Sequence, residues 1–467
     1  MAAMQPFVDW KNSIGISTTL VDVATIGNNS TSIKNYITSV YNAGNLAYVL
    51  LVGDLNEIKS PSYAGGESDP TYSTITADWY PDLFVGRFSA QTVAHVDTQV
   101  QRTLEYEQQN HDLGADAWNA KGMGVASNQG SGIGHYGEGD NTHMNKIRSE
   151  LLSYGFTTVD QIYDYSGTKA QVTSGLNNGR RIVNYCGHGS TTAWSSTGFN
   201  NNDVNNLTNV GKLPFICSVA CVNGDFGSTT CFAEAWMRAT HNGAPTGAVA
   251  CYMSTINQSW APPMYGQGNH GTGGKYGGAE RFWSESNWSI GGEWFGGSCA
   301  MMDIVGNSGR EMFMTWIIFG DPSLRVIGTS ADLTLMADTS TLPVTREENV
   351  NFTIDMGSAF AGYNYYMMGS LSGTEPGLPL PGGQVLPINF DFLTNMIISS
   401  VNGINFQNFY STLDASGMGY PIFSTQGQTP LDPSAVGAKL YFAAIVWTGS
   451  GATFDAVTNA RTVTFVN

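Results

Sequence analysis

Short apolar runs that alternate with helical patterns are the feature that most constrains the fold of this chain. Each run is too short for a helix and reads as a strand buried on both faces. Their alternation with helices predicts a mainly parallel sheet that is covered by helices. The runs that predict strands are 47–54, 82–88, 121–127, 181–186, 213–220 and 247–254, and helical patterns cover 32–44, 92–110, 140–156 and 232–243.

The pattern changes after residue 326. From there, strand-like segments alternate with loops rich in glycine, proline, serine and asparagine, and no helical pattern intervenes. This arrangement predicts an all-β sandwich. We therefore expect an N-terminal α/β subdomain at 1–115, a second α/β subdomain with the candidate catalytic residues at 116–326, and a β domain at 327–467.

Composition excludes several classes of function. The net charge of −17 disfavours a nucleic-acid partner, and no apolar stretch approaches the length of a transmembrane segment. All six cysteines and all seven histidines lie before residue 300, so reactive chemistry is confined to the α/β part. The cysteines show no metal-binding spacing, and most lie in apolar runs, where buried free thiols are the common state. The chain does not open with a signal-peptide pattern, so we expect any signal or pro-segment to be absent from it.

Two predicted strands end in reactive residues. The run 181–186 is followed by Gly187-His188-Gly189, and the run 213–220 is followed by Cys221. If these strands are neighbours in a parallel sheet, both side chains emerge at the same edge, where ligands bind in such folds. A histidine is the usual partner that activates a cysteine thiol, and the amides of Gly189 and Cys221 would suit an oxyanion. The alternative is a structural histidine and a cysteine that packs in the core.

The motifs around these residues resemble those of the gingipains, a family of caspase-like cysteine peptidases. The segments "NYCGHGSTTAW" and "SVACVNGDF" carry the resemblance, which continues through "CFAEAWMRA", "STINQSWAPPM" and "WIIFGDPSL" and covers about residues 7–326. It implies a caspase-like α/β fold of two subdomains, followed by an immunoglobulin-like domain. No cofactor is then required for catalysis, although the family uses structural calcium, for which Asp78 and Asp82 are candidates.

The resemblance also implies roles for individual residues. Cys221 corresponds to the nucleophile and His188 to the general acid and base, with Gly189 as an oxyanion donor. Asp140, in "GHYGEGDNTH", corresponds to the carboxylate at the floor of the arginine pocket, and Trp260 to an aromatic ring that covers the bound side chain. From the residues alone, Asp140 is more often a helix cap than a ligand, and Trp260 is ordinary core packing.

Two positions depart from the family pattern. Where the family has an acidic residue that orients the histidine, this chain has Gln129, whose neutral amide can accept a hydrogen bond but cannot stabilise an imidazolium by charge. Glu138 is an alternative partner that lies close in sequence. The glycine-rich segment 265–280 also differs, and it predicts a loop at the rim of the cleft.

Together these features predict a secreted or cell-surface cysteine endopeptidase. It would cleave protein or peptide substrates after arginine, through a thioester between Cys221 and the substrate. Two alternatives stay open. One is a lysine-specific peptidase of the same fold, and the other is a binding protein with weak or no catalysis, for which Gln129 is the sign.

Overall fold

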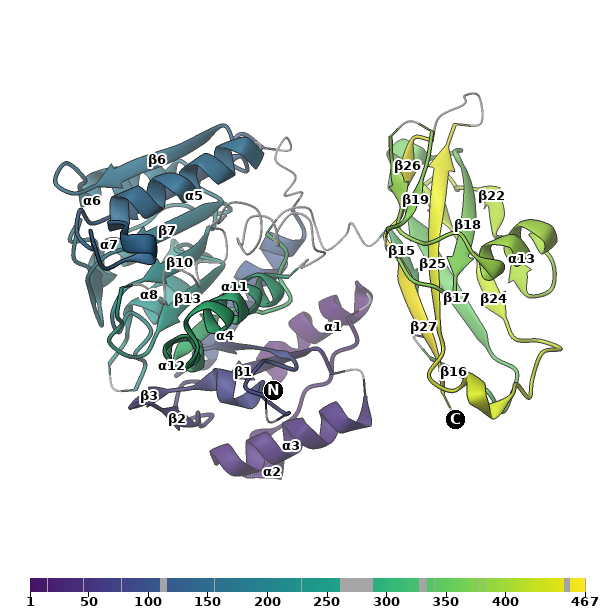
Figure 1. The fold of residues 1–467 in the computed structure, drawn as a ribbon, viewed down its shortest axis with the longest axis horizontal. Helices are drawn as coiled ribbons and strands as arrows, with labels where there is room; N and C mark the ends of the chain where they lie inside the picture. The colour runs from purple at the N-terminus through teal and green to yellow at the C-terminus, as the bar shows by residue number, and fades with distance from the viewer. Residues whose placement is uncertain are drawn as a thin grey trace. The chain divides into compact units, whose positions relative to one another are not determined.

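The computed structural model describes the chain except for residues 15, 45, 77, 110–115, 155, 228, 261–288, 327–333, 340, 375, 382, 449–453 and 467. The chain divides into two compact units (Figure 1). One comprises Met1–Asp9 and Thr19–Thr329, and the other comprises Trp10–Thr18 and Ser330–Asn467. The predicted boundary between residues 115 and 116 stays a prediction.

The first unit is built on one eight-stranded sheet. From edge to edge its strands are β1 (Tyr48–Val52), β4 (Phe84–Phe88), β14 (Trp316–Phe319), β13 (Ala250–Ser254), β10 (Phe215–Val219), β7 (Ile182–Cys186), β5 (Lys121–Ala126) and β6 (Thr158–Tyr163). All neighbours are parallel except β13 and β14, so the sheet consists of two parallel blocks of opposite direction. The prediction of a mainly parallel sheet is confirmed.

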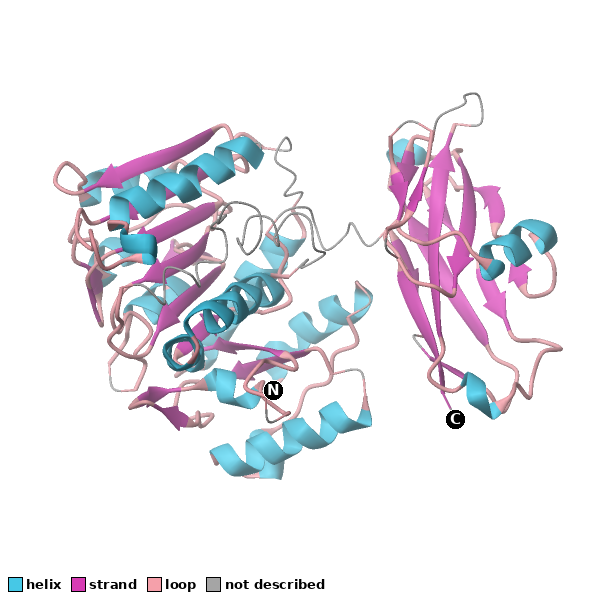
Figure 2. Cartoon of the chain, viewed as in Figure 1, coloured by secondary structure: helices cyan, strands magenta, loops and turns pink. Residues whose placement is uncertain are grey.

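Helices cover both faces of this sheet, as the uninterrupted burial of its inner strands β7, β10, β13 and β14 requires (Figure 2). One apolar core cluster unites the sheet with α5 (Asp140–Tyr154), α11 (Ile290–Val305) and α12 (Asn307–Met314). A second cluster on the other face includes α6 (Lys169–Asn177), α7 (Asn201–Asn205) and α8 (Phe232–Arg238). The other α-helices that are described in the first 329 residues are α1 (Gln5–Ser13), α2 (Val23–Ile26), α3 (Ser30–Ala43) and α4 (Val93–Glu107).

The helix predicted at 232–243 is shorter in the structure, and α8 ends at Arg238. The remaining residues form a hairpin of β11 (Thr240–His241) and β12 (Ala244–Pro245). Asn242 and Gly243 at its turn have φ angles of +52° and +82°. An Asn-Gly pair with positive φ at both positions is the preferred turn of a tight hairpin, so local turn chemistry overrides the helical pattern.

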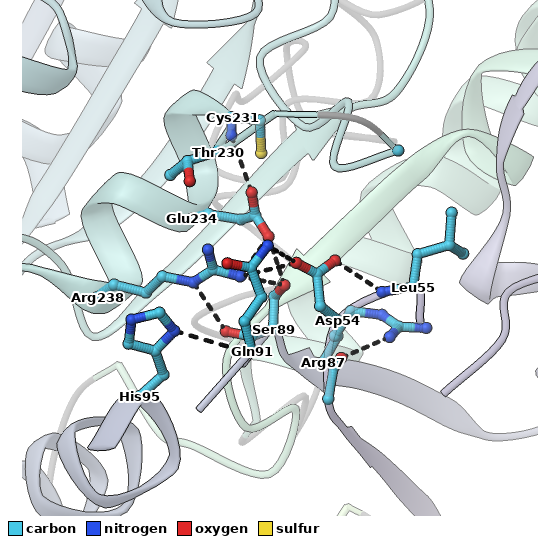
Figure 3. Close-up of polar contacts among 12 residues, drawn as sticks. Asp54, Leu55, Arg87, Ser89, Gln91, His95, Thr230, Cys231, Glu234 and Arg238 are labelled. Carbon is cyan, nitrogen blue, oxygen red and sulfur yellow. Dashed lines mark hydrogen bonds and ion pairs between the residues drawn. The ribbon is translucent and has the colours of Figure 1, made fainter. Parts of the chain in front are cut away.

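A buried polar network ties β1 and β4 to α8 (Figure 3). Glu234 accepts a hydrogen bond from Ser89 Oγ at 2.6 Å and lies 2.5 Å from Arg238 Nη2, which also lies 3.2 Å from Asp54 Oδ2. The other oxygen of Glu234 accepts from the backbone N–H of Cys231 and so caps α8. Burial raises the pKa of Glu234, against the opposing effect of the Arg238 guanidinium. The network joins parts of the chain from either side of the predicted subdomain boundary.

The second unit is rich in antiparallel strands, as predicted. One sheet contains β15 (Leu335–Ala337), β17 (Asn349–Asp355), β24 (Ile422–Ser424), β21 (Phe406–Gln407) and β23 (Met418–Gly419). The other contains β16 (Thr341–Pro343), β27 (Arg461–Val466), β25 (Lys439–Trp447), β18 (Asn364–Ser370), β22 (Tyr410–Thr412) and β26 (Ala456–Val457). Side chains from both sheets share one apolar core. The immunoglobulin-like assignment of this unit stays a prediction.

The expectation that no helix interrupts the β unit was wrong, because α13 (Phe392–Ser400) lies between β20 (Val385–Leu386) and β21. Asp391 caps this helix by accepting from the backbone N–H of Leu393 at 2.9 Å. Leu393 and Ile397, four residues apart, are buried on one side of it. The pattern of buried positions is short, and strand-like neighbours surround it, so the helix depends on its cap.

No helix among the described residues is long and apolar enough to cross a membrane.

We predict that Asp391→Ala loosens α13. Although burial raises the pKa of Asp391, hydrogen bonds from Ser370, Ser372 and Leu371 lower it to about 2 from its ordinary 3.8. A depressed pKa means that the stabilisation is present above about pH 4 and is lost as the pH falls towards 2. Loss of a cap costs about 1–2 kcal/mol, so amide exchange in α13 is expected to accelerate about five- to thirtyfold at pH 7.

Hydrogen exchange of the full chain, measured by mass spectrometry, checks this expectation. Asp391→Asn is the matched control, because it keeps an oxygen for the cap and loses the charge. Equal exchange of α13 in wild type and Asp391→Ala would contradict the dependence on the cap.

Candidate active site

Four neighbouring parallel strands place their carboxyl ends at one edge of the sheet, and a pocket lies there. In register, Ala126 of β5 pairs with Cys186 of β7, and Cys186 pairs with Val219 of β10. The chain beyond these ends carries His188 and Cys221, as predicted from the sequence. The residues that line the pocket are Asp140, Cys186, Gly187, His188, Val219, Ala220, Cys221, Gln258, Ser259 and Trp260.

His188 is held by its backbone and by one side chain. Its carbonyl oxygen accepts from Tyr185 Oη at 2.6 Å and from the N–H of Ser195 at 2.9 Å. Its Nε2 lies 2.8 Å from Oε1 of Gln129. The amide of Gln129 therefore contacts the imidazole at the position predicted for an orienting partner.

Glu138, the alternative partner, faces other groups. Its carboxylate pairs with Lys146 and lies 3.7 Å from Nδ1 of His143. Burial raises the pKa of Glu138, but the hydrogen bonds with His143 and Lys146 prevail and lower it to about 2. These contacts occupy the carboxylate of Glu138, whereas His188 Nε2 contacts Gln129.

Cys221 lies half-buried on a tightly fixed turn. Its Sγ accepts from the backbone N–H of Gln258 at 3.3 Å. The following residue, Val222, has a φ of +50°, which is rare for a β-branched side chain and costs about 1–3 kcal/mol. The N–H of Val222 donates to Ile256 O at 3.0 Å, and the N–H of Gly224 donates to Ser254 O at 2.8 Å. The end of β13 thus anchors the strained turn that presents the thiol.

Asp140 is fully buried at the start of α5, with its carboxylate against the pocket. Oδ2 accepts from Ser127 Oγ at 2.5 Å, and Oδ1 accepts from Trp260 Nε1 at 2.9 Å and from Cys186 Sγ at 3.4 Å. Burial raises the pKa of Asp140, and these three donors oppose the rise. All three donors are neutral, and the nearby His143 imidazole also lowers the pKa of this buried carboxylate.

Trp260 joins the carboxylate to the histidine. Its ring meets the His188 ring edge to face, with centroids 5.3 Å apart and planes at 79°. On the other side it presses on Gly130, where an added Cβ would lie 2.5 Å from Trp260 Nε1 and where φ is +79°. Residue 130 must therefore be glycine for the indole to reach Asp140. Trp260 lines the pocket and also packs against the neighbouring apolar core cluster.

Ser127 and Cys186 were not among the residues singled out from the sequence. Ser127 directly follows β5, the position at which such sheets bind ligands, so its place was a usable signal. Cys186 is the last residue of β7 and reads as core packing. Burial, and then the nearby Asp140 carboxylate, raises the pKa of the Cys186 thiol well above its ordinary value. All six cysteines are free, as expected.

The candidate calcium residues lie elsewhere. Asp82 accepts from the backbone N–H groups of Ile75 and Thr76 at 2.6 and 2.8 Å, and Thr76 Oγ1 lies 3.1 Å from Asp78. Within the described part of the chain, no group of three histidine, cysteine, aspartate or glutamate residues is arranged to hold a metal ion. Calcium binding stays a prediction, and the glycine-rich segment 265–280 lies outside the described residues.

The fold and the pocket together define the class of this protein, a caspase-like α/β protein with a thiol and an imidazole at neighbouring strand ends. Within that class the chain belongs to peptidase family C25, whose family model matches residues 1–327.

Relatives and solved structures agree with this assignment. Gingipain R1 of Porphyromonas gingivalis is 34% identical over 472 residues, which cover 98% of this chain and 45% of that protein. Gingipain R2 of the same species is 40% identical over 329 residues, which cover 69% of this chain and 44% of that protein. The crystal structure of the Arg-specific cysteine proteinase gingipain R matches with a TM-score of 0.67 at 29% identity, over 99% of this chain and 94% of that one. The chain spans less than half the length of these curated relatives.

Proposed function

We propose that this protein is a cysteine endopeptidase that cleaves protein or peptide substrates after arginine. The observation that carries the proposal is the pocket itself, which brings the Cys221 thiol and the His188 imidazole together with the buried carboxylate of Asp140. Membership of a peptidase family supports the reaction class. One matching solved structure is that of an Arg-specific cysteine proteinase, and this match supports arginine as the residue before the cleaved bond.

In the proposed reaction, His188 takes the proton of the Cys221 thiol, and the thiolate attacks the carbonyl carbon of the scissile peptide bond. The backbone N–H groups of Gly189 and Cys221 donate to the oxyanion that forms. His188 then gives a proton to the leaving amine, and the carbonyl carbon stays bound to Cys221 as a thioester. Water, deprotonated by His188, hydrolyses the thioester and releases the thiol. Gln129 orients the imidazole ring through its Oε1.

Asp140 is the proposed receptor for the substrate guanidinium. In the free protein the indole N–H of Trp260 occupies Oδ1 of Asp140. A guanidinium offers two parallel N–H groups to a carboxylate and replaces a single neutral donor with a charged pair. The ammonium of lysine cannot form that bidentate pair, which is why arginine is preferred over the lysine alternative. The displaced Trp260 ring would cover the aliphatic stem of the bound side chain.

The remaining proposals concern the setting of the reaction. Catalysis by a thiol and an imidazole requires no redox or nucleotide cofactor. Structural calcium near Asp78 and Asp82 is retained as a proposal. We also propose that the protein is secreted or displayed at the cell surface, as the resemblance to the gingipains implies.

Cys221→Ala is predicted to abolish hydrolysis of an arginyl fluorogenic peptide between pH 6 and 9. Removal of a catalytic nucleophile lowers kcat by about 10⁴-fold or more, which brings the rate to background. Iodoacetamide should inactivate the wild type in parallel with alkylation of Cys221. If the wild type releases product no faster than Cys221→Ala, the protein is a binding protein and the peptidase proposal is wrong.

Asp140→Asn is predicted to lower kcat/KM for arginyl substrates by about 10²–10³-fold, because a buried charge loses its partner. The kcat/KM for a matched lysyl substrate should fall much less, so the preference for arginine over lysine should largely disappear. Since burial raises the pKa of Asp140, arginine cleavage by the wild type should weaken as the pH falls and this carboxylate takes up a proton. An unchanged ratio of arginyl to lysyl cleavage in the variant would show that Asp140 does not bind the substrate side chain.

Gln129→Glu is predicted to raise the rate of Cys221 alkylation by iodoacetamide at pH 6 by about three- to tenfold. A carboxylate 2.8 Å from the imidazole favours its protonated form, and that cation stabilises the thiolate. Gln129→Ala is the control, because it removes the contact without adding charge. The proposed role of this position fails if Gln129→Glu reacts no faster than Gln129→Ala.

A further inference from the structure

A buried asparagine links the loop of the nucleophile to the hairpin that follows the histidine. Asn223, two residues after Cys221, has no exposed surface. Its Nδ2 donates to the carbonyl oxygen of Ser190 at 2.6 Å and to that of Ala193 at 3.2 Å. These two residues belong to β8 (Gly189–Ser190) and β9 (Ala193–Trp194), which pair as a short antiparallel hairpin. One side chain therefore holds both strands of the hairpin.

Further hydrogen bonds close this contact into a ring. Oδ1 of Asn223 accepts from Ser218 Oγ at 2.8 Å. Ser218 Oγ accepts in turn from Nε1 of Trp194 at 2.9 Å, and Trp194 is the last residue of the same hairpin. Ser218 and Trp194 are themselves fully buried. Both ends of the Asn223 amide are satisfied, so its orientation is fixed by the ring.

The ring determines how Gly189 meets the nucleophile. Gly189 directly precedes Ser190, and a Cβ added to it would lie 2.8 Å from Ala220 Cβ and 3.0 Å from both Asn223 Nδ2 and Cys221 O. The hairpin thus packs directly on the backbone around Cys221. Any opening of the ring would shift the Gly189 amide relative to the amide of Cys221.

We propose that Asn223 is a positioning residue that fixes the spacing of the two oxyanion amides. The inference rests on the proposed function, and it assigns Asn223 no contact with substrate. An oxyanion exists in the tetrahedral intermediate and not in the bound substrate, so misplaced amides lower kcat far more than they raise KM. The thiol itself is held separately, because the N–H of Gln258 donates to its Sγ, and Val222 and Gly224 donate to the backbone at the end of β13.

Asn223→Asp tests this inference, because it replaces both Nδ2 donors with an oxygen that faces two carbonyl groups. The expected result is a loss of about 10²–10³-fold in kcat for an arginyl peptide, with KM changed by no more than about threefold. Binding of an arginyl aldehyde, whose adduct with Cys221 places an oxygen in the oxyanion hole, should weaken about 10²-fold. Alkylation by iodoacetamide, which forms no oxyanion, should proceed at the wild-type rate.

Asn209→Asp is the matched control. Asn209 is also buried and also bridges backbone groups, with Nδ2 donating to Gly247 O at 2.8 Å and Oδ1 accepting from Gly247 N at 2.9 Å, but it lies outside the pocket lining. Ser218→Ala is a second variant that opens the same ring by removing one hydroxyl, and it serves if Asn223→Asp does not fold. It should also lower kcat and leave alkylation unchanged.

Two outcomes overturn the inference while the wild type is active. In one, Asn223→Asp and Ser218→Ala lose no more kcat than Asn209→Asp. In the other, alkylation of Cys221 falls together with kcat, which would mean that the ring holds the thiol and not the amides. An inactive wild type is a different result, because it contradicts the proposed function itself.

Discussion

The parallel pairing of β7 with β10 is the constraint on which the rest of the site depends. Cys186 and Val219 lie opposite each other at the ends of these strands, and His188 and Cys221 each follow two residues later. A shift of the register by two residues would separate the two side chains by about 6.6 Å, and a shift by one would turn one strand over. Burial of both strands on both faces prevents such shifts, because every residue of β7 and β10 is buried. The burial that stabilises the sheet therefore also fixes the positions of the side chains in the pocket.

Much of this arrangement follows from the sequence because its signals are local. A continuous apolar run predicts a buried strand, and the residues that directly follow it are placed at the sheet edge without knowledge of any contact. For that reason the positions of His188 and Cys221 were predictable, whereas the contact of Gln129 with the histidine was expected from the resemblance to the gingipains. The helix α11 was not, because "IGGEWFGGSCAMMDIV" is apolar on most sides and shows no helical stripe. A helix of this kind is specified by what surrounds it.

The contacts that complete the pocket were beyond the sequence for a related reason. The ring through Asn223 joins residues from two strand ends and a hairpin, and it exists only when both strands are in register. The contacts of Asp140 with Ser127, Cys186 and Trp260 likewise come from three separate segments. Polar residues in such positions have no periodic pattern, so their partners are decided by the tertiary fold and by the cost of leaving a buried polar group unpaired.

The Asp140 carboxylate and the His188 imidazole both have uncharged hydrogen-bond partners in this pocket. Asp140 holds a buried carboxylate on hydrogen bonds from a hydroxyl, a thiol and an indole, all weaker partners for it than a cation. Gln129 contacts His188 through an amide oxygen that carries no charge. In both places the hydrogen-bond partners are neutral. Under the proposed function, a bound guanidinium would give Asp140 a charged partner and displace Trp260, whose ring lies against His188. Recognition of arginine and the surroundings of the His188 imidazole would then be coupled through one indole, and a substrate without a cation would leave that indole in place.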